Sequence, residues 1–210
     1  MTAYTGWFDY VIPDIPGITN TLAEQAIRNA VIDFCRRTLL YRKTLAAISI
    51  VGGTATYTVT PDANTLVSDF LTVLVNGKPI DPQTEAWLDQ EVLNWRTTAT
   101  GPAKAYISPA NNQITLVPKP SESIASGLVV AVAQRPTRAS TECPDWLMED
   151  YAEEIAHGAK ARLFAMKRKP WSDPGLSKYH MGEFNAAIGI GAVRASQART
   201  RTRLRTAICY

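Results

Sequence analysis

The sequence predicts an α+β protein: a helical bundle of about three long helices, with an antiparallel β-rich insertion between the first and second helices. Two observations support this fold class. Apolar residues recur every three or four positions in segments near both ends of the chain, which is typical of amphipathic helices. In residues 45–136 the period changes to two and turn residues become frequent. The chain has 210 residues, enough for one domain with a sizeable insert.

Residues 1–18 are predicted to form an extended N-terminal arm. The segment is apolar and aromatic, and Pro13 and Pro16 oppose a helix of any length. Such an arm either packs on its own domain or reaches a neighbouring molecule. Trp7 and Phe8 are the side chains we expect at a contact between subunits.

Residues 19–44 are predicted to be the first part of the helical domain. Thr21 and Glu24 have the T-x-x-E spacing of a capping box, and no breaker interrupts residues 21–42. Arginines lie mostly off the apolar stripe, which favours a solvated basic face over a binding face.

The insertion, residues 45–136, is predicted to contain six or seven short antiparallel strands in a small sandwich or partly open barrel. Gly52-Gly53 lies between two strand-like runs and indicates a hairpin. Asn76-Gly77 is the strongest hairpin signal, because a type I′ turn needs positive φ at both central residues.

Residues 137–198 are predicted to be the second part of the helical domain, and residues 141–171 carry the strongest helix signal. Pro144 suits a first helical position, and acidic residues at the start and basic residues at the end complement the helix dipole. The side chains expected to pack the helical core are Leu147, Tyr151, Ile155, Leu163, Phe34 and Phe184.

A third helix is predicted to begin at Ser172-Asp173-Pro174. Its glycines weaken a helix by about 1 kcal/mol each relative to alanine, but they allow another backbone to approach closely. We therefore expect Gly182, Gly189 and Gly191 at an interface between copies. One face is predicted to pack, and it comprises Leu176, Tyr179, His180, Phe184, Ala187, Ile188 and Gly191.

The last segment, residues 199–210, is predicted to be an extended basic tail. Although the net charge is only +3, this segment alternates in period two and concentrates arginines. A solvated tail and a tail that docks on an acidic partner are equally compatible with this pattern. Its candidate binding residues are Arg199, Arg201, Arg203, Arg205 and Tyr210.

Catalytic signatures are missing from the sequence. There is no P-loop, nucleophile elbow or dinucleotide fingerprint, and three cysteines without a CxxC pattern favour neither disulfides nor zinc. Glu154 and His157 have the E-x-x-H spacing of di-metal bundles, but only one copy occurs. We expect no enzyme, no cofactor and no metal, and also no signal peptide or membrane span.

A group of segments along the chain carries a family resemblance through their order. They are Ala26–Thr38, Val75-Asn76-Gly77, Trp95, Gly101-Pro102, Tyr106, Ile114–Pro120, Ala159–Leu163, Lys169–Pro174 and His180–Phe184. In this order the segments resemble those of phage head-to-tail adaptor proteins, a family that includes connectors and tail tubular or gatekeeper proteins. The resemblance covers roughly residues 20–190.

This resemblance implies a structural virion protein that assembles as a ring, usually dodecameric, under the portal vertex after DNA packaging. Its implied partners are the portal protein, neighbouring copies of itself and a downstream tail or nozzle protein. Genomic DNA would pass through the channel without sequence readout, and no membrane is involved. The implied location is the head-tail joint of the virion, and the host cytoplasm before assembly. The arginine tail would dock on acidic portal surface.

Two other functions stay open at this point. The first is a tail-completion or stopper protein of the same neck region, which only a partner test separates from an adaptor. The second is a non-specific DNA-binding module that acts through the arginine tail. That module would bind DNA with a steep dependence on salt concentration.

Overall fold

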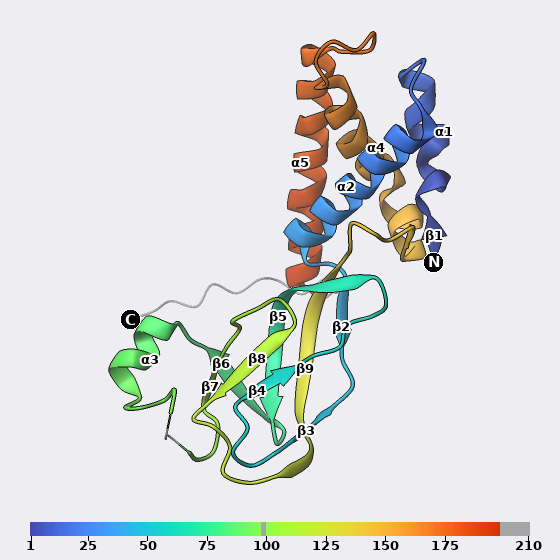
Figure 1. The fold of residues 1–210 in the computed structure, drawn as a ribbon. Coiled ribbons are helices and arrows are strands. Elements are labelled where there is room, and N and C mark those ends of the chain that lie inside the picture. Colours follow the sequence, from blue (N-terminus) through green and yellow to red (C-terminus); the bar gives the residue numbers. More distant parts are fainter. Residues whose placement is uncertain (98–99, 198–210) are drawn as a thin grey trace. The chain divides into compact units, whose positions relative to one another are not determined.

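The structure is a computed structural model, and it describes residues 1–97 and 100–197. The chain forms two compact units (Figure 1). Among the described residues, the helical unit comprises 1–40 and 136–197, and the β unit lies within 41–135. The α+β fold class predicted from the sequence is confirmed.

Five α-helices occur in the described residues, whereas the sequence predicted about three. They are α1 (Phe8–Val11), α2 (Asn20–Thr38), α3 (Glu85–Glu91), α4 (Asp145–Phe164) and α5 (Pro174–Ser196). The three long helices α2, α4 and α5 contact one another pairwise in the helical unit. The short α3 belongs to the β unit, and α1 lies in the N-terminal segment that was expected to be extended.

The N-terminal segment is helical instead of extended. After β1 (Thr2–Ala3) come η1 (Tyr4–Trp7), α1 and η2 (Ile12–Asp14), and β1 pairs with β10 (Glu142–Cys143). Pro13 sits in the first turn of η2, where a missing N–H costs nothing, so it starts a turn and does not prevent one. The buried side chains recur at helical spacing; they are Tyr4, Trp7, Val11 and Ile15.

The predicted capping box of the first long helix is absent. Helix α2 begins at Asn20 after Thr19, whose side chain makes no capping bond. The Glu24 carboxylate instead accepts a hydrogen bond of 2.7 Å from Arg28, one helical turn later. The helix ends at Thr38 because Leu39 takes a left-handed conformation, with φ 53°.

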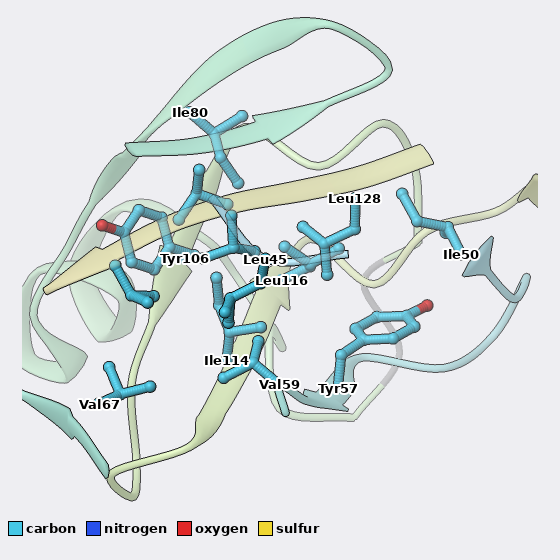
Figure 2. Packing of buried hydrophobic residues seen from close by; sticks show 13 residues of the cluster. Leu45, Ile50, Tyr57, Val59, Val67, Ile80, Tyr106, Ile114, Leu116 and Leu128 are labelled. Atoms are coloured by element: carbon cyan, nitrogen blue, oxygen red, sulfur yellow. The ribbon is translucent and has the colours of Figure 1, made fainter. Parts of the chain in front are cut away.

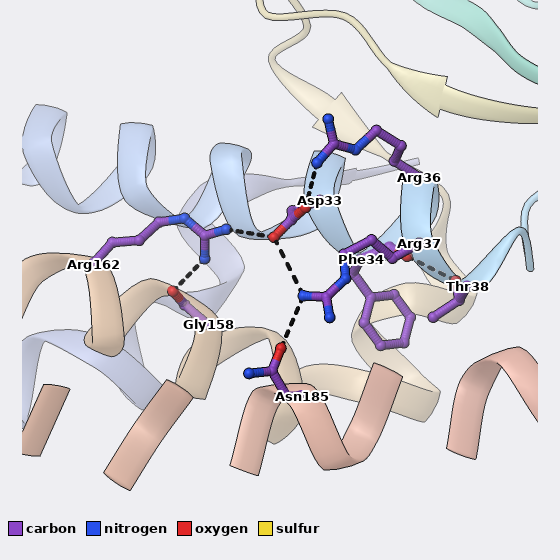
Figure 3. A network of polar contacts seen from close by, with 8 residues as sticks. All are labelled: Asp33, Phe34, Arg36, Arg37, Thr38, Gly158, Arg162 and Asn185. Atoms are coloured by element: carbon purple, nitrogen blue, oxygen red, sulfur yellow. Dashed lines mark hydrogen bonds and ion pairs between the residues drawn. The ribbon is translucent and has the colours of Figure 1, made fainter. Parts of the chain in front are cut away.

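Aromatic packing and one carboxylate join the three long helices. The Phe34 ring on α2 lies 4.9 Å from the Tyr151 ring on α4 and 6.3 Å from the Phe184 ring on α5. Beside them, Asp33 accepts hydrogen bonds from Arg36 and from Arg162 of α4 (Figure 3). The six side chains predicted to pack the helical core are at most 4% exposed.

Helix α4 is shorter than predicted and is kinked. It contains one residue with non-helical angles, Tyr151 (φ −142°, ψ 28°), and it ends at Phe164. The chain then turns, with Arg168 at φ 62°, before α5 begins.

The β unit contains a curled mixed sheet of eight strands (Figure 1). The strands follow the order β2-β9-β5-β6-β7-β8-β4, and β3 also pairs with β9. Strands β6 and β7 are parallel, so the prediction of a purely antiparallel insert was wrong. The strands are β2 (Arg42–Thr44), β3 (Ile48–Ile50), β4 (Thr56–Thr58), β5 (Thr65–Val75), β6 (Lys78–Pro82), β7 (Ala105–Ile107), β8 (Gln113–Val117) and β9 (Ile124–Pro136).

One predicted hairpin forms and the other does not. Strands β5 and β6 pair across Asn76-Gly77, where φ is 49° and 73°, as a type I′ turn requires. At Gly52-Gly53 no hairpin forms, since β3 pairs with β9 and β4 with β8. The Gly53 N–H donates to Pro120 O at 2.7 Å, so the glycine pair lies against the β8–β9 connection.

The core of the β unit consists of apolar side chains that point inward from the curled sheet. Figure 2 shows this cluster, in which the rings of Tyr57 and Tyr106 pack among aliphatic side chains. The other labelled members are Leu45, Ile50, Val59, Val67, Ile80, Ile114, Leu116 and Leu128.

Candidate assembly surface of the helical unit

Helix α5 begins where the sequence predicted. The Asp173 side chain accepts hydrogen bonds from the backbone N–H groups of Gly175 at 2.8 Å and Leu176 at 3.0 Å. Pro174 occupies the first turn. This cap satisfies two of the N–H groups that the first turn of a helix leaves without intrahelical partners.

The outer side of α5 is apolar and exposed. Leu176, Tyr179, Ile190 and Val193 are 44%, 57%, 59% and 48% exposed. Tyr179, Ile190 and Val193 follow Leu176 by 3, 14 and 17 residues. In a helix these spacings place all four side chains on one side. Exposed apolar side chains that lie on one side of a helix are typical of an interaction site. We call this surface the α5 face, defined as Leu176, Tyr179, Gly182, Ala186, Gly189, Ile190 and Val193.

Leu176 and Tyr179 were predicted to lie on the packed side of the helix, but both side chains are exposed. The inner side holds the other members of that predicted stripe, from His180 to Gly191. Ile190 and Val193 were missed, although their spacing from Ala186 already indicated a second apolar stripe. Two apolar stripes on one helix are the signal that could have revealed the α5 face.

The three glycines predicted at an interface have different surroundings. A Cβ added to Gly182 or Gly189 would meet no atom within 4 Å, and both residues are exposed. At Gly191 the added atom would lie 2.8 Å from Thr38 Cγ2. Gly191 therefore allows α5 to approach the end of α2 within its own chain, which corrects its expected place at a contact between copies.

Of the two aromatic residues predicted at an interface, Trp7 is an internal residue. Its side chain has no exposed surface, and its indole N–H donates to Ala152 O of α4 at 3.1 Å. It therefore offers nothing to a neighbouring copy while the unit is folded. Phe8 is half-buried and keeps some accessible surface.

A groove between α4 and α5 adjoins the α5 face. Its volume is about 320 Å³, and Ala186 and Ile190 belong to both surfaces. Glutamates give the groove an acidic character, and the Arg194 guanidinium lies at 5.8 Å from the Tyr151 ring. The lining residues are Tyr151, Glu153, Glu154, His157, Glu183, Ala186, Ala187, Ile190 and Arg194.

The predicted tail residues lie outside the described part of the chain. These are Arg199, Arg201, Arg203, Arg205 and Tyr210, and the structure gives no position for them. Helix α5 ends at Ser196, so the tail follows directly from the helix that carries the α5 face.

The described residues do not bring together the side chains of a metal site. Within residues 1–97 and 100–197, no group of three His, Cys, Asp or Glu side chains is placed to hold a metal ion. Burial raises the pKa of the Cys143 thiol to about 12, which suppresses the thiolate at neutral pH. Among the described helices, none has the length and hydropathy needed to cross a bilayer.

Comparison with known protein families gives a match over nearly the whole chain. The model of the family described as SU10 adaptor protein matches residues 4–207, which is nearly the whole chain. No curated protein matches the chain.

Proposed function

Because the chain belongs to the SU10 adaptor protein family, we propose that it forms a ring beneath the portal vertex and surrounds part of the DNA channel. Membership in this family of phage head-to-tail adaptors gives the chain a structural role in the virion, with portal and tail proteins as partners. Our proposal adds three features to family membership: the ring, its dodecameric number and the passage of DNA without sequence readout.

The observation that supports self-assembly is the exposed apolar α5 face. A closed ring uses one heterologous contact repeatedly, so each subunit must present two different surfaces. We propose that the α5 face is one of them. The open space at Gly182 and Gly189 would let a neighbouring backbone approach the helix there. Phe8, which is half-buried, is a candidate for the opposing surface.

Replacing Ile190 with glutamate is expected to weaken subunit association by at least about tenfold, because an unpaired charge would be buried at the contact. The residue is 59% exposed, so the fold itself should be unaffected. The measurement is light-scattering mass of the protein mixed with portal protein. Leu93→Glu is the matched control, since Leu93 is an 86% exposed apolar residue of the β unit. Normal assembly of the Ile190 variant would exclude the α5 face from the ring contact.

We also propose that the arginine tail binds the portal. Deleting residues 199–210 is expected to abolish portal binding and to leave the fold intact, because the last described helix ends at Ser196. Binding should also weaken with salt, since exposed charges are screened. Pull-down and circular dichroism measure the two effects.

A control for the tail deletion replaces the four tail arginines with lysines and so keeps their positive charge. This variant should retain most of the binding if charge attracts the tail to an acidic surface. Full portal binding by the truncated chain would disprove the tail proposal. The same assay separates an adaptor from a tail-completion protein, which would not bind the portal directly, and a salt-dependent DNA titration tests the DNA-binding alternative.

A further inference from the structure

The only two histidines of the chain meet between α4 and α5. The Nδ1 atoms of His157 and His180 lie 2.7 Å apart, which is hydrogen-bonding distance. His180 is only 9% exposed, and the Phe164 ring stacks on it with centroids 5.6 Å apart and an angle of 7° between the planes. The Tyr179 ring contacts it edge-on at 5.1 Å. The pair is therefore a part-buried polar link between two packed helices, and His180 is the more covered of the two rings.

The hydrogen bond in this pair depends on the protonation of both rings. When both imidazoles are neutral, one Nδ1–H donates and the other Nδ1 accepts with its lone pair. If only one of the two rings gains a proton, the Nδ1 atom of the other ring can still accept the hydrogen bond. When both rings are cationic, each Nδ1 carries a hydrogen, and two donors face each other with two positive charges. The contact then has to open.

The surroundings of His180 oppose its protonation, first of all through burial of the ring. Burial, His157 and Lys160 of α4 lower the pKa of His180, whereas Asp14 of η2 and Glu183 of α5 act in the opposite direction. The Lys160 Nζ lies 2.5 Å from the Asp14 carboxylate, so Asp14 is already paired. Glu153 and Glu154 of α4 line the same groove as His157.

We propose that the contact between His157 and His180 is a proton-sensitive link that holds α4 against α5 at neutral pH and opens when both rings are protonated. Because His157 lines the groove beside the α5 face, opening changes the shape of that groove. Protons come from and return to solvent, so no other reactant is needed.

The sign of the pH dependence follows from the lowered pKa of His180. As the pH falls below the ordinary value of 6.5, the unfolded chain binds a proton at this residue before the folded chain does. The stabilisation is therefore complete above pH 6.5 and is lost as the pH falls toward the lowered folded pKa.

The direct test is nitrogen NMR of the full chain labelled in its histidine rings. The chain contains two histidines, so only two sets of ring signals have to be assigned. We expect a coupling between the two Nδ1 nuclei through the hydrogen bond near pH 7.5, and its loss on acidification together with a coupled titration. Absence of the coupling at neutral pH, or two independent titrations, would overturn the proposal.

A second test measures thermal unfolding by circular dichroism at pH 7.5 and 5.0. We expect the Tm of the unaltered chain to fall by at least about 2 °C more than that of His180→Phe, which keeps the stacking on Phe164 and cannot titrate. Tyr179→Phe is the matched control and should retain the full fall. Equal falls in the unaltered chain and His180→Phe would contradict the proposal, and the NMR test applies whether or not this variant folds.

Discussion

Replacing Trp7 with alanine is expected to lower the free energy of unfolding by about 3–5 kcal/mol, the range for removing a large aromatic side chain from a core. The indole has no exposed surface and donates a hydrogen bond to Ala152 O of α4. Truncation would leave a cavity and remove this hydrogen bond. Urea unfolding followed by circular dichroism gives the difference in free energy.

Phe8→Ala is the matched control for this experiment. It removes a neighbouring aromatic ring that is only half-buried, so it should cost much less than the Trp7 variant. The comparison separates two roles for the N-terminal segment. If Trp7→Ala costs less than about 1 kcal/mol, the segment behaves as a detachable arm and not as part of the helical core.

Gly158→Ala is expected to destabilise the helical unit by about 1–2 kcal/mol, although alanine is the better helix former by about 1 kcal/mol. An added Cβ would lie 2.7 Å from two ring atoms of Phe184. That ring is fully buried, with the Arg162 guanidinium 5.4 Å from its centroid, so it has little room to move. Overpacking therefore outweighs helix propensity.

Gly182→Ala is the control with the opposite expected sign. This residue also lies inside a helix, but its added Cβ would meet nothing within 4 Å. The substitution should stabilise the isolated chain by up to about 1 kcal/mol. Thermal unfolding of both variants measures the contrast. If Gly158→Ala is as stabilising as Gly182→Ala, then α4 and α5 do not pack as closely as described.

The predictions that held rest on interactions within a few residues. Asn76-Gly77 makes its own turn because both residues tolerate positive φ, and Asp173 caps α5 by bonding to residues two and three positions later. The helical core was also predictable, because side chains such as Phe34 and Phe184 recur at the helical period.

Two of the predictions that failed involved partners that are distant in the sequence. Gly52-Gly53 looks like a hairpin turn, but β3 and β4 find longer partners in β9 and β8. The prolines of the N-terminal segment suggested an extended arm. Burial of Trp7 and its neighbours against α4 stabilises the folded segment by more than the prolines oppose it.

The α5 face, the acidic groove and the histidine pair depend on which side of each helix is covered. The sequence shows that α5 has apolar residues and that two histidines exist, 23 positions apart. Only the packing of α4 and α2 against one side of α5 decides that Ile190 is exposed and that His180 is enclosed. Local hydrogen-bond and dihedral preferences are thus readable from the chain, whereas burial is a property of several elements together.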